Sequence, residues 1–431
     1  MSWEPDFIGV DSGSTDSGPF YLGSGESHFS DAAYYRDLRL ILLAGREAKV
    51  PVIVGSAGSA GADVHVDRIA EIVRQIGHDE NLTFRLALIY SQQDPEYLVG
   101  KLQTGKITPL RNAPEISEAR LRQSSRIVGM AGVEPFIEAL ENGAEVVISG
   151  RSSDTSIFSA IPTMRGMNPA PVWHAAKILE CGAAAVTRRK HPDPLFAVVD
   201  DEGFTVEPPN PDYRCDPVSI ASHNLYENAT PFELIEPSGV LNTVAARYEA
   251  VSDRAVRVTG STFEPSTCYT IKIEGAELVG YQSLIIGGVR DPIILRQLDS
   301  WLDGMQEAIR GRWSAVFGPD VESSCQLDLR VYGRDAVMGP LESVTSVGHE
   351  VGIVFQVTAK TQELASALMK SAGHIAVHFP VPEWTGLITG LAFPYSPAEI
   401  DRGPAYQFNL HHVVEPDSPT EMFRLAYETV G

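Results

Sequence analysis

Short apolar runs that end in glycine and serine recur through the first third of the chain, and this repetition constrains the fold more than any other feature. The runs lie at residues 7–10, 50–58, 84–91, 125–132 and 144–154. Segments with helical spacing of apolar residues, such as 34–49 and 64–76, separate them. Short buried strands that alternate with amphipathic helices predict an α/β fold with a parallel, Rossmann-like sheet and flanking helices. Ligands bind at the carboxyl ends of the strands in such sheets, which is where the glycine and serine residues fall.

The last part of the chain has a different pattern. Strand-like stretches at 325–333, 350–359 and 406–414 surround a helix-like stretch at 361–378. This order predicts a small C-terminal α+β domain. We therefore expect one domain over residues 1–320 and a second over residues 321–431. A proline-rich stretch marks a possible subdivision of the first domain near residues 190–215.

The charge of the chain limits its partners. Asp plus Glu number 56 and Lys plus Arg 34, a formal charge of −22. Such a surface repels phosphate backbones and anionic lipid, which argues against nucleic acid or a membrane as the main partner. The four cysteines form no Cys-x-x-Cys pair, so they predict reduced thiols rather than a zinc or iron–sulfur site. With neither a signal peptide nor a long apolar run, the sequence predicts a cytoplasmic protein.

The first glycine-rich loop resembles a phosphate-binding loop. IGVDSGST (Ile8–Thr15) is similar to the first phosphate loop of the actin, sugar-kinase and heat-shock ATPase superfamily. That fold requires a β-hairpin directly after the loop, but Gly18 and Pro19 intervene, and proline breaks a hairpin ladder. An ATP site is therefore the less favoured hypothesis for this loop. The loop supplies the substrate-binding candidates Ser14 and Thr15 and the catalytic candidate Asp16.

The second loop, residues 55–67, follows an apolar run and opens a helix. Its free amides and the helix dipole can bind a carboxylate or phosphate, with Ser56 and Gly58 as substrate-binding candidates. Asp63 is a further substrate-binding candidate and His65 a catalytic one. The alternative is that Asp63 caps the helix and His65 is a surface histidine.

The third loop and the helix after it provide the remaining candidates. Asp154 is a catalytic candidate or only a helix N-cap. Arg151 can clamp a substrate carboxylate, with the Ser152 and Ser153 side chains as hydrogen-bond donors. Spacing along a predicted helix brings His174, Lys177 and Cys181 near one face. Lys177, Glu180 and Cys181 form an acid–base group or, alternatively, a structural ion pair beside a buried thiol. We assign Lys177 as catalytic and His174, Glu180 and Cys181 as substrate-binding.

Several long motifs occur in order and carry a resemblance to one family. They are DSGSTDSGPFYLGSG, VIVGSAGSAGADVHVD, IVGMAGVEPFIEALENGAEVVISGRSSDT, WHAAKILECGA, SHNLYENATPFELIEPSG and YTIKIEGAELVGYQSL. Together they are similar to the acyclic terpene utilisation AtuA family. The segment after about residue 320 resembles the small ferredoxin-like domain that accompanies this family. The resemblance implies breakdown of acyclic terpenes, whose branched acid intermediates are carried as CoA thioesters, and implies that the loops belong to one site.

These observations predict a lyase or hydratase that acts on a branched or hydroxylated carboxylic acid or its CoA thioester. Such an enzyme needs a base for the α-proton, an acid for the departing hydroxyl and donors for the enolate oxygen. The alternatives are an ATP-dependent enzyme, a hydrolase or transferase with Ser56 or Cys181 as nucleophile, or a non-catalytic subunit of a catabolic complex. The sequence requires no cofactor and gives no metal signature. An exposed edge on the C-terminal sheet favours a homo-oligomer.

Overall fold

The computed structural model describes residues 3–226, 228, 230–383 and 390–431, and these divide into two compact units. The first unit comprises Met1–Glu277 with Phe408–Gly431, and the second comprises Leu278–Gln407. Strands β14 (Ile271–Val289) and β17 (Glu399–Val414) have residues in both units. The boundary expected near residue 320 falls within the second unit.

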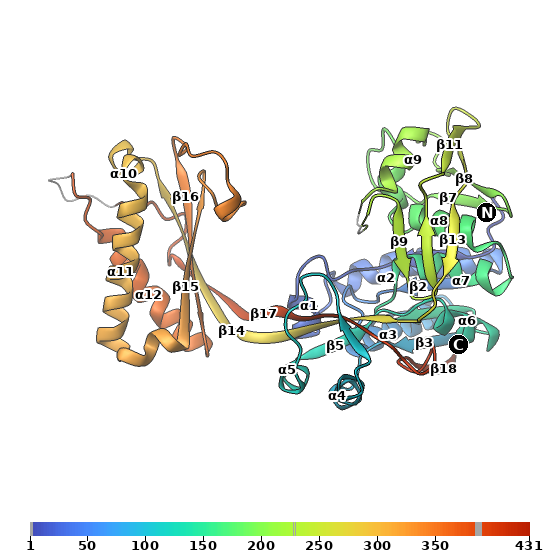
Figure 1. The fold of residues 1–431 in the computed structure, drawn as a ribbon, viewed down its shortest axis with the longest axis horizontal. Helices are drawn as coiled ribbons and strands as arrows, with labels where there is room; N and C mark the ends of the chain where they lie inside the picture. Colours follow the sequence, from blue (N-terminus) through green and yellow to red (C-terminus); the bar gives the residue numbers. More distant parts are fainter. Residues whose placement is uncertain (1–2, 227, 229, 384–389) are drawn as a thin grey trace. The chain divides into compact units, whose positions relative to one another are not determined.

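A five-stranded sheet forms the centre of the first unit (Figure 1). Its order is β1 (Ile8–Asp11), β2 (Val52–Gly55), β6 (Val146–Ser149), β3 (Phe84–Tyr90) and β18 (Arg424–Val430). The first four strands are parallel, and β18 pairs antiparallel with β3.

Alternate residues of these strands pack into two hydrophobic cores, because successive side chains of a strand point to opposite faces. Val54 and Leu88 pack with helices α2 (Asp31–Ala48) and α3 (Asp63–Asp79). Ile53 and Ile89 pack in the other core with helices that include α4 (Pro95–Gln103), α6 (Glu134–Glu141) and α7 (Asp154–Met164). The predicted mixed α/β architecture with flanking helices is therefore confirmed, while the Rossmann-like assignment stays a prediction.

The apolar run at 125–132 does not join this sheet. It forms β5 (Arg126–Gly129), which pairs antiparallel with residues 273–276 of β14. The position beside β3 is taken by β18. The remaining elements of this part are α1 (Phe20–Ser24), β4 (Ile107–Pro109), α5 (Glu118–Gln123) and α8 (Pro169–Leu179).

Residues 196–265 form a β-rich insertion after α8. One sheet has the order β13 (Thr262–Pro265), β10 (Gly239–Asn242), β9 (Glu233–Glu236). A second has the order β11 (Arg247–Ala250), β12 (Val256–Thr259), β8 (Gly203–Glu207), β7 (Phe196–Val199), and helix α9 (Pro217–His223) precedes β9. Both sheets contact α8, which carries site residues at its C-terminal end.

The second unit has the element order β-α-α-β-β-α-β. Between β14 and β17 come α10 (Pro292–Arg296), α11 (Leu298–Phe317), β15 (Cys325–Tyr332), β16 (Val351–Ala359) and α12 (Gln362–His378). The strand order is β15-β16-β14-β17, and the core contains Trp301 and Trp313 of α11 with Met369 of α12. Because α11 packs into this core, the unit begins before residue 320. The name ferredoxin-like stays a prediction.

Within the described residues, none of the helices has both the length and the apolar character needed to cross a bilayer.

Candidate active site

The three predicted loops meet at the carboxyl edge of the parallel strands. The Ser59 hydroxyl donates to the Ser14 carbonyl at 3.0 Å, and the Arg151 amide donates to the Gly61 carbonyl at 2.9 Å. A Cβ at Gly13 would lie 2.2 Å from the Ser59 Cα, and a Cβ at Gly61 would lie 2.1 Å from the Arg151 nitrogen. These glycines therefore let the loop backbones pack directly against each other.

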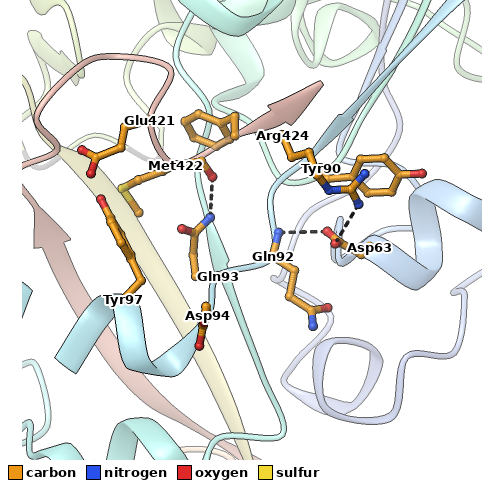
Figure 2. A pocket seen from close by; sticks show the side chains of 10 residues that line it. Asp63, Tyr90, Gln92, Gln93, Asp94, Tyr97, Glu421, Met422 and Arg424 are labelled. Carbon is orange, nitrogen blue, oxygen red and sulfur yellow. Dashed lines mark hydrogen bonds and ion pairs between the residues drawn. The ribbon is translucent and has the colours of Figure 1, made fainter. Parts of the chain in front are cut away.

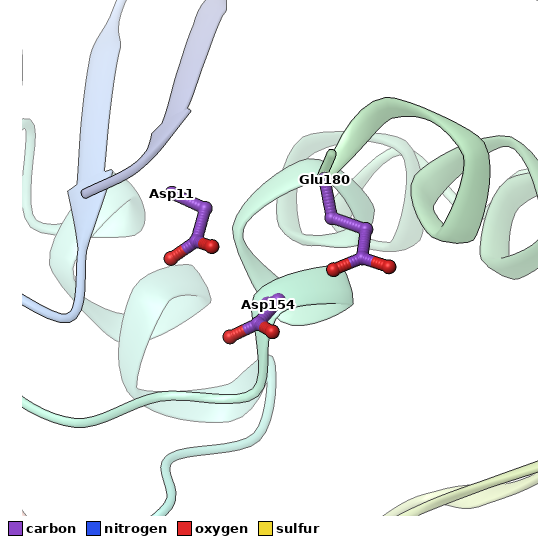
Figure 3. Close-up of side chains that lie close together, drawn as sticks. All are labelled: Asp11, Asp154 and Glu180. Atoms are coloured by element: carbon purple, nitrogen blue, oxygen red, sulfur yellow. The ribbon is translucent and has the colours of Figure 1, made fainter. Parts of the chain in front are cut away.

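Three carboxyl groups converge at this edge (Figure 3). Asp11 ends β1, Asp154 begins α7 and Glu180 follows α8, and each offers an oxygen within 4.8 Å of the others. Burial and the Asp154 charge raise the pKa of Asp11 well above its ordinary value. Burial raises the pKa of Glu180 to about 7. We call these three residues the carboxylate cluster, and burial favours the protonated form in two of its members.

Carboxylate oxygens at this spacing are also ligands that Mg²⁺ or Ca²⁺ accepts. A divalent cation would favour the ionised forms of the same three groups. The donor set therefore fits either proton transfer or cation binding.

Glu180 has two partners that fix its orientation. Lys177 Nζ lies 2.5 Å from Glu180 Oε1, and the Tyr226 hydroxyl donates to the same oxygen at 2.9 Å. The Lys177 ammonium also lies 4.0 Å from the centre of the Tyr226 ring, a cation–π contact. The side chains of Lys177 and Glu180 are almost completely buried. These contacts therefore hold the Glu180 carboxyl group in one orientation.

Arg151 is turned toward a neighbouring group of charges. Its Nε lies 3.2 Å from Glu274 Oε2, and its Nη1 lies 3.4 Å from Asp154 Oδ1. Lys272 Nζ lies 2.7 Å from Glu274 Oε1, and the Thr15 hydroxyl donates to Glu274 Oε2 at 3.1 Å. Although burial opposes its ionisation, Arg151 and Lys272 lower the pKa of Glu274 to about 2. The guanidinium is buried among these partners and also binds the Ser56 hydroxyl.

A fourth buried carboxyl group, Glu236, lies at the end of β9. Its oxygens accept hydrogen bonds from the Ser153 hydroxyl at 2.7 and 2.9 Å and from the Thr155 hydroxyl. Burial raises the pKa of Glu236 to about 7, and the hydroxyl donors oppose that rise.

Both predicted histidines bind other groups. His65 Nδ1 accepts from the Ala62 amide at 3.0 Å, and its Nε2 donates to the Glu26 carbonyl at 3.0 Å. His174 Nδ1 lies 2.6 Å from the Ser261 hydroxyl, and burial lowers the pKa of His174 to about 3. Both rings therefore stay neutral at physiological pH, and each joins segments of the first unit.

Asp63 lines a separate pocket of about 230 Å³ at the carboxyl end of β3 (Figure 2). Asp63 Oδ1 accepts from the Gln92 amide at 3.1 Å, and its Oδ2 lies 3.6 Å from Arg424 Nη2. The Arg424 guanidinium lies 3.7 Å from the centre of the Tyr90 ring. Asp63 thus lines a pocket separate from the carboxylate cluster, although both lie at the carboxyl edge of the same sheet.

The predicted residues accordingly fall into two sets. Those at or next to the carboxylate cluster are Thr15, Ser56, Arg151, Ser153, Asp154, Lys177 and Glu180. Ser14 and Gly58 lie in the packed loops, the Ser152 side chain is buried beside Gly55, and Cys181 is exposed next to Glu180. Asp16 is exposed, and Asp63, His65 and His174 have the separate contacts given above.

Asp11 belongs to the first predicted loop but was given no role of its own, and sequence reasoning missed Tyr226, Glu236, Lys272 and Glu274 as members of this region. Asp11 carries a usable signal, because it directly follows a predicted strand at the carboxyl edge. The other four come from distant segments, and nothing in their local sequence points to this edge.

Comparison with known proteins gives one match. The model of the family described as acyclic terpene utilisation family protein AtuA matches residues 30–383, which span most of the chain and parts of both units. Searches of the curated proteins and of the solved structures found no match.

Proposed function

Because this chain belongs to the acyclic terpene utilisation AtuA family, which indicates a metabolic role, we propose that it is a hydro-lyase. Its substrate would be a branched or hydroxylated carboxylic acid, or the CoA thioester of such an acid. One observation carries the proposal: the carboxylate cluster brings three acids from separate loops together, and one of them has a pKa of about 7. Dehydration next to a carbonyl requires a general acid and a general base that both reach the substrate.

In the dehydration direction, the Cα–H bond breaks and its proton passes to the carboxylate of Asp11 or Asp154. The electron pair forms the double bond as the Cβ–O bond breaks, and the hydroxyl leaves as water with a proton from Glu180. Glu180 is then reprotonated from solvent through Lys177, whose Nζ lies 2.5 Å from Glu180 Oε1, and the aspartate releases the α-proton to solvent. Hydration is the same sequence reversed.

We assign Arg151 to holding Asp154 rather than to clamping the substrate carboxylate, because its guanidinium binds Glu274 and lies beside Asp154. The amides of Ser56, Ala57, Ser59 and Gly61 in the second loop already donate to main-chain carbonyls, so we do not assign them as donors for the enolate oxygen. Asp16 and His65, our other catalytic candidates, have no direct role in this scheme.

The proposal is tested first by ligand-induced stabilisation, since a ligand that binds the folded state raises its melting temperature. The panel contains branched 3-hydroxyacyl-CoA and enoyl-CoA thioesters, the free acids, and ATP with Mg²⁺. Ligands that stabilise the protein are then assayed for interconversion by the ultraviolet absorbance of the unsaturated thioester. Stabilisation by ATP alone contradicts the proposal, and absence of any shift favours a non-catalytic subunit.

Variants then locate the chemistry. Asp11→Asn, Asp154→Asn and Glu180→Gln should each lower turnover by about 100-fold or more, as expected for loss of a general acid or base. Asp16→Asn is the matched control from the same loop and should retain turnover. Full activity in all three cluster variants would exclude the carboxylate cluster as the catalytic site.

A further inference from the structure

Glu236 is a buried carboxyl group that the proposed reaction does not use. It lies in the β-rich insertion, and only 6% of the residue is exposed. Both of its oxygens accept hydrogen bonds from Ser153, and one also accepts from Thr155. These two donors are the immediate neighbours of Asp154 in sequence. A residue of the insertion therefore holds the chain on each side of a member of the carboxylate cluster.

The first turn of α7 lacks the usual side-chain hydrogen bond at its N-cap, and the contact with Glu236 accounts for this. Ser153 occupies the N-cap position, yet its side chain makes no capping hydrogen bond. A serine in this position normally accepts from an amide of the first turn. Here the hydroxyl donates to Glu236. The first turn is consequently attached to β9 through side chains.

We propose that Glu236 is a positioning residue for Asp154. By binding Ser153 and Thr155, it fixes the first turn of α7 so that the Asp154 carboxyl group faces Asp11 and Glu180. This inference rests on the proposed function, because it concerns the geometry of a residue assigned to proton transfer. A glutamate suits the task because its two acceptor oxygens can take both hydroxyl donors at once.

Hydrogen exchange tests the inference without a substrate. The amides of Ser153 and Ser156 donate to the carbonyls of Ala131 and Ser153, so they report whether this turn is closed. In Glu236→Ala, exchange of a peptide covering 151–158 should be about tenfold faster, since local opening becomes easier. Glu236→Gln keeps one acceptor and should restore part of the protection. Glu264→Gln, an exposed glutamate of the same small sheet, is the control.

Unchanged exchange of 151–158 in Glu236→Ala overturns the inference. An equal rise across the whole first unit also overturns it, because this would mark Glu236 as a general structural residue. The exchange experiment needs no substrate. It therefore tests the inference even if the protein converts none of the proposed substrates, a result that would contradict the proposed function.

Kinetics add a second criterion on any substrate that the wild type converts. Glu236→Ala should lower kcat about tenfold with little change in KM, and Glu236→Gln should recover part of the loss, as expected for displaced catalytic geometry. Faster exchange with unchanged kcat contradicts the positioning role and leaves the proposed function intact.

Discussion

Two buried glutamates, Glu274 beside the carboxylate cluster and Glu180 within it, have pKa values that are shifted in opposite directions from that of an ordinary carboxyl group. Glu274 lies between Arg151 and Lys272, and these cations lower its pKa to about 2 despite burial. Glu180 has the ammonium of Lys177, but burial dominates and its pKa rises to about 7. Burial alone therefore does not decide the charge of a group here. The cations around Glu274 outweigh its burial, whereas the single ammonium beside Glu180 does not.

Among the variants considered, Glu274→Gln, which removes the charge of Glu274, should cause the largest change in unfolding free energy. Glu274→Gln leaves Arg151 buried without its main partner, and breaking a buried ion pair in this way costs about 3–5 kcal/mol of unfolding free energy. Urea denaturation at neutral pH measures the change. The control is Glu96→Gln, which removes an exposed partner of Arg122 and should cost under about 1 kcal/mol. An equal loss in both variants would show that the Glu274 pair behaves like a surface contact.

The second test uses the pH dependence of stability at Glu236. Burial raises the pKa of Glu236 from 4.5 to about 7, so the folded state holds its proton more tightly than the unfolded state. Below the unfolded value both states are protonated, and the unfolded state loses its proton first as the pH rises. As the pH rises from about 4.5 to about 7, the unfolding free energy of the wild type should therefore fall by up to about 3 kcal/mol relative to that of Glu236→Gln.

Unfolding free energies of the two proteins at several pH values between 4 and 8 provide this measurement. Asp154 and Glu180 lie close enough to affect the titration, so Glu236→Gln is also compared in an Asp154→Asn background. A pH-independent difference between Glu236→Gln and the wild type would contradict the raised pKa.

Asp11→Asn should produce a smaller change of opposite sign to that of Glu274→Gln. Burial and Asp154 raise the pKa of Asp11, so its ionised form opposes folding at high pH. The variant should be more stable than the wild type at pH 8, and the difference should disappear near pH 3, where Asp11 is protonated in both the folded and the unfolded wild type. Thermal melts with and without a chelator provide the measurement. A loss of stability at pH 8 that the chelator reproduces in the wild type would instead indicate a bound divalent cation.

Asp16→Asn should have the smallest effect. Asp16 is exposed and lies outside the carboxylate cluster, so its unfolding free energy should stay within about 0.5 kcal/mol of the wild type. A larger change, measured by the same denaturation experiment, would bring the outer part of the first loop into the charge network.

The elements of this fold that could be predicted are those whose own sequence carries a pattern of apolar residues or a loop motif. Apart from Gly55 and Ser149 at their ends, the strands at 52–55 and 146–149 are apolar because both faces of the sheet are covered, and the loops after them follow from the carboxyl-edge rule. Arg151 and Asp154 follow from the same reasoning, whereas Glu180 was singled out from the spacing of residues along a predicted helix. The pairing of β5 with β14 was not, because an apolar run carries no information about its partner.

The surroundings of the site were also hidden from local patterns. Glu274 reaches Arg151 from a strand more than a hundred residues later, and Tyr226 reaches Glu180 from the insertion. Whether a carboxyl group ends with a low or a high pKa depends on such distant neighbours. The identity of the site residues was thus easier to predict than their protonation.

The pairing of β18 with β3 has a consequence for synthesis on the ribosome. Residues 84–90 form β3, but its antiparallel neighbour is made from residues 424–430, after the whole of the second unit has been translated. The second unit is contiguous and can fold while the nascent chain still lacks β18. During that interval the edge of β3, an almost wholly apolar strand, is unpaired and can associate with other strands. We therefore expect the newly made first unit to be exposed to aggregation until β18 has been synthesised.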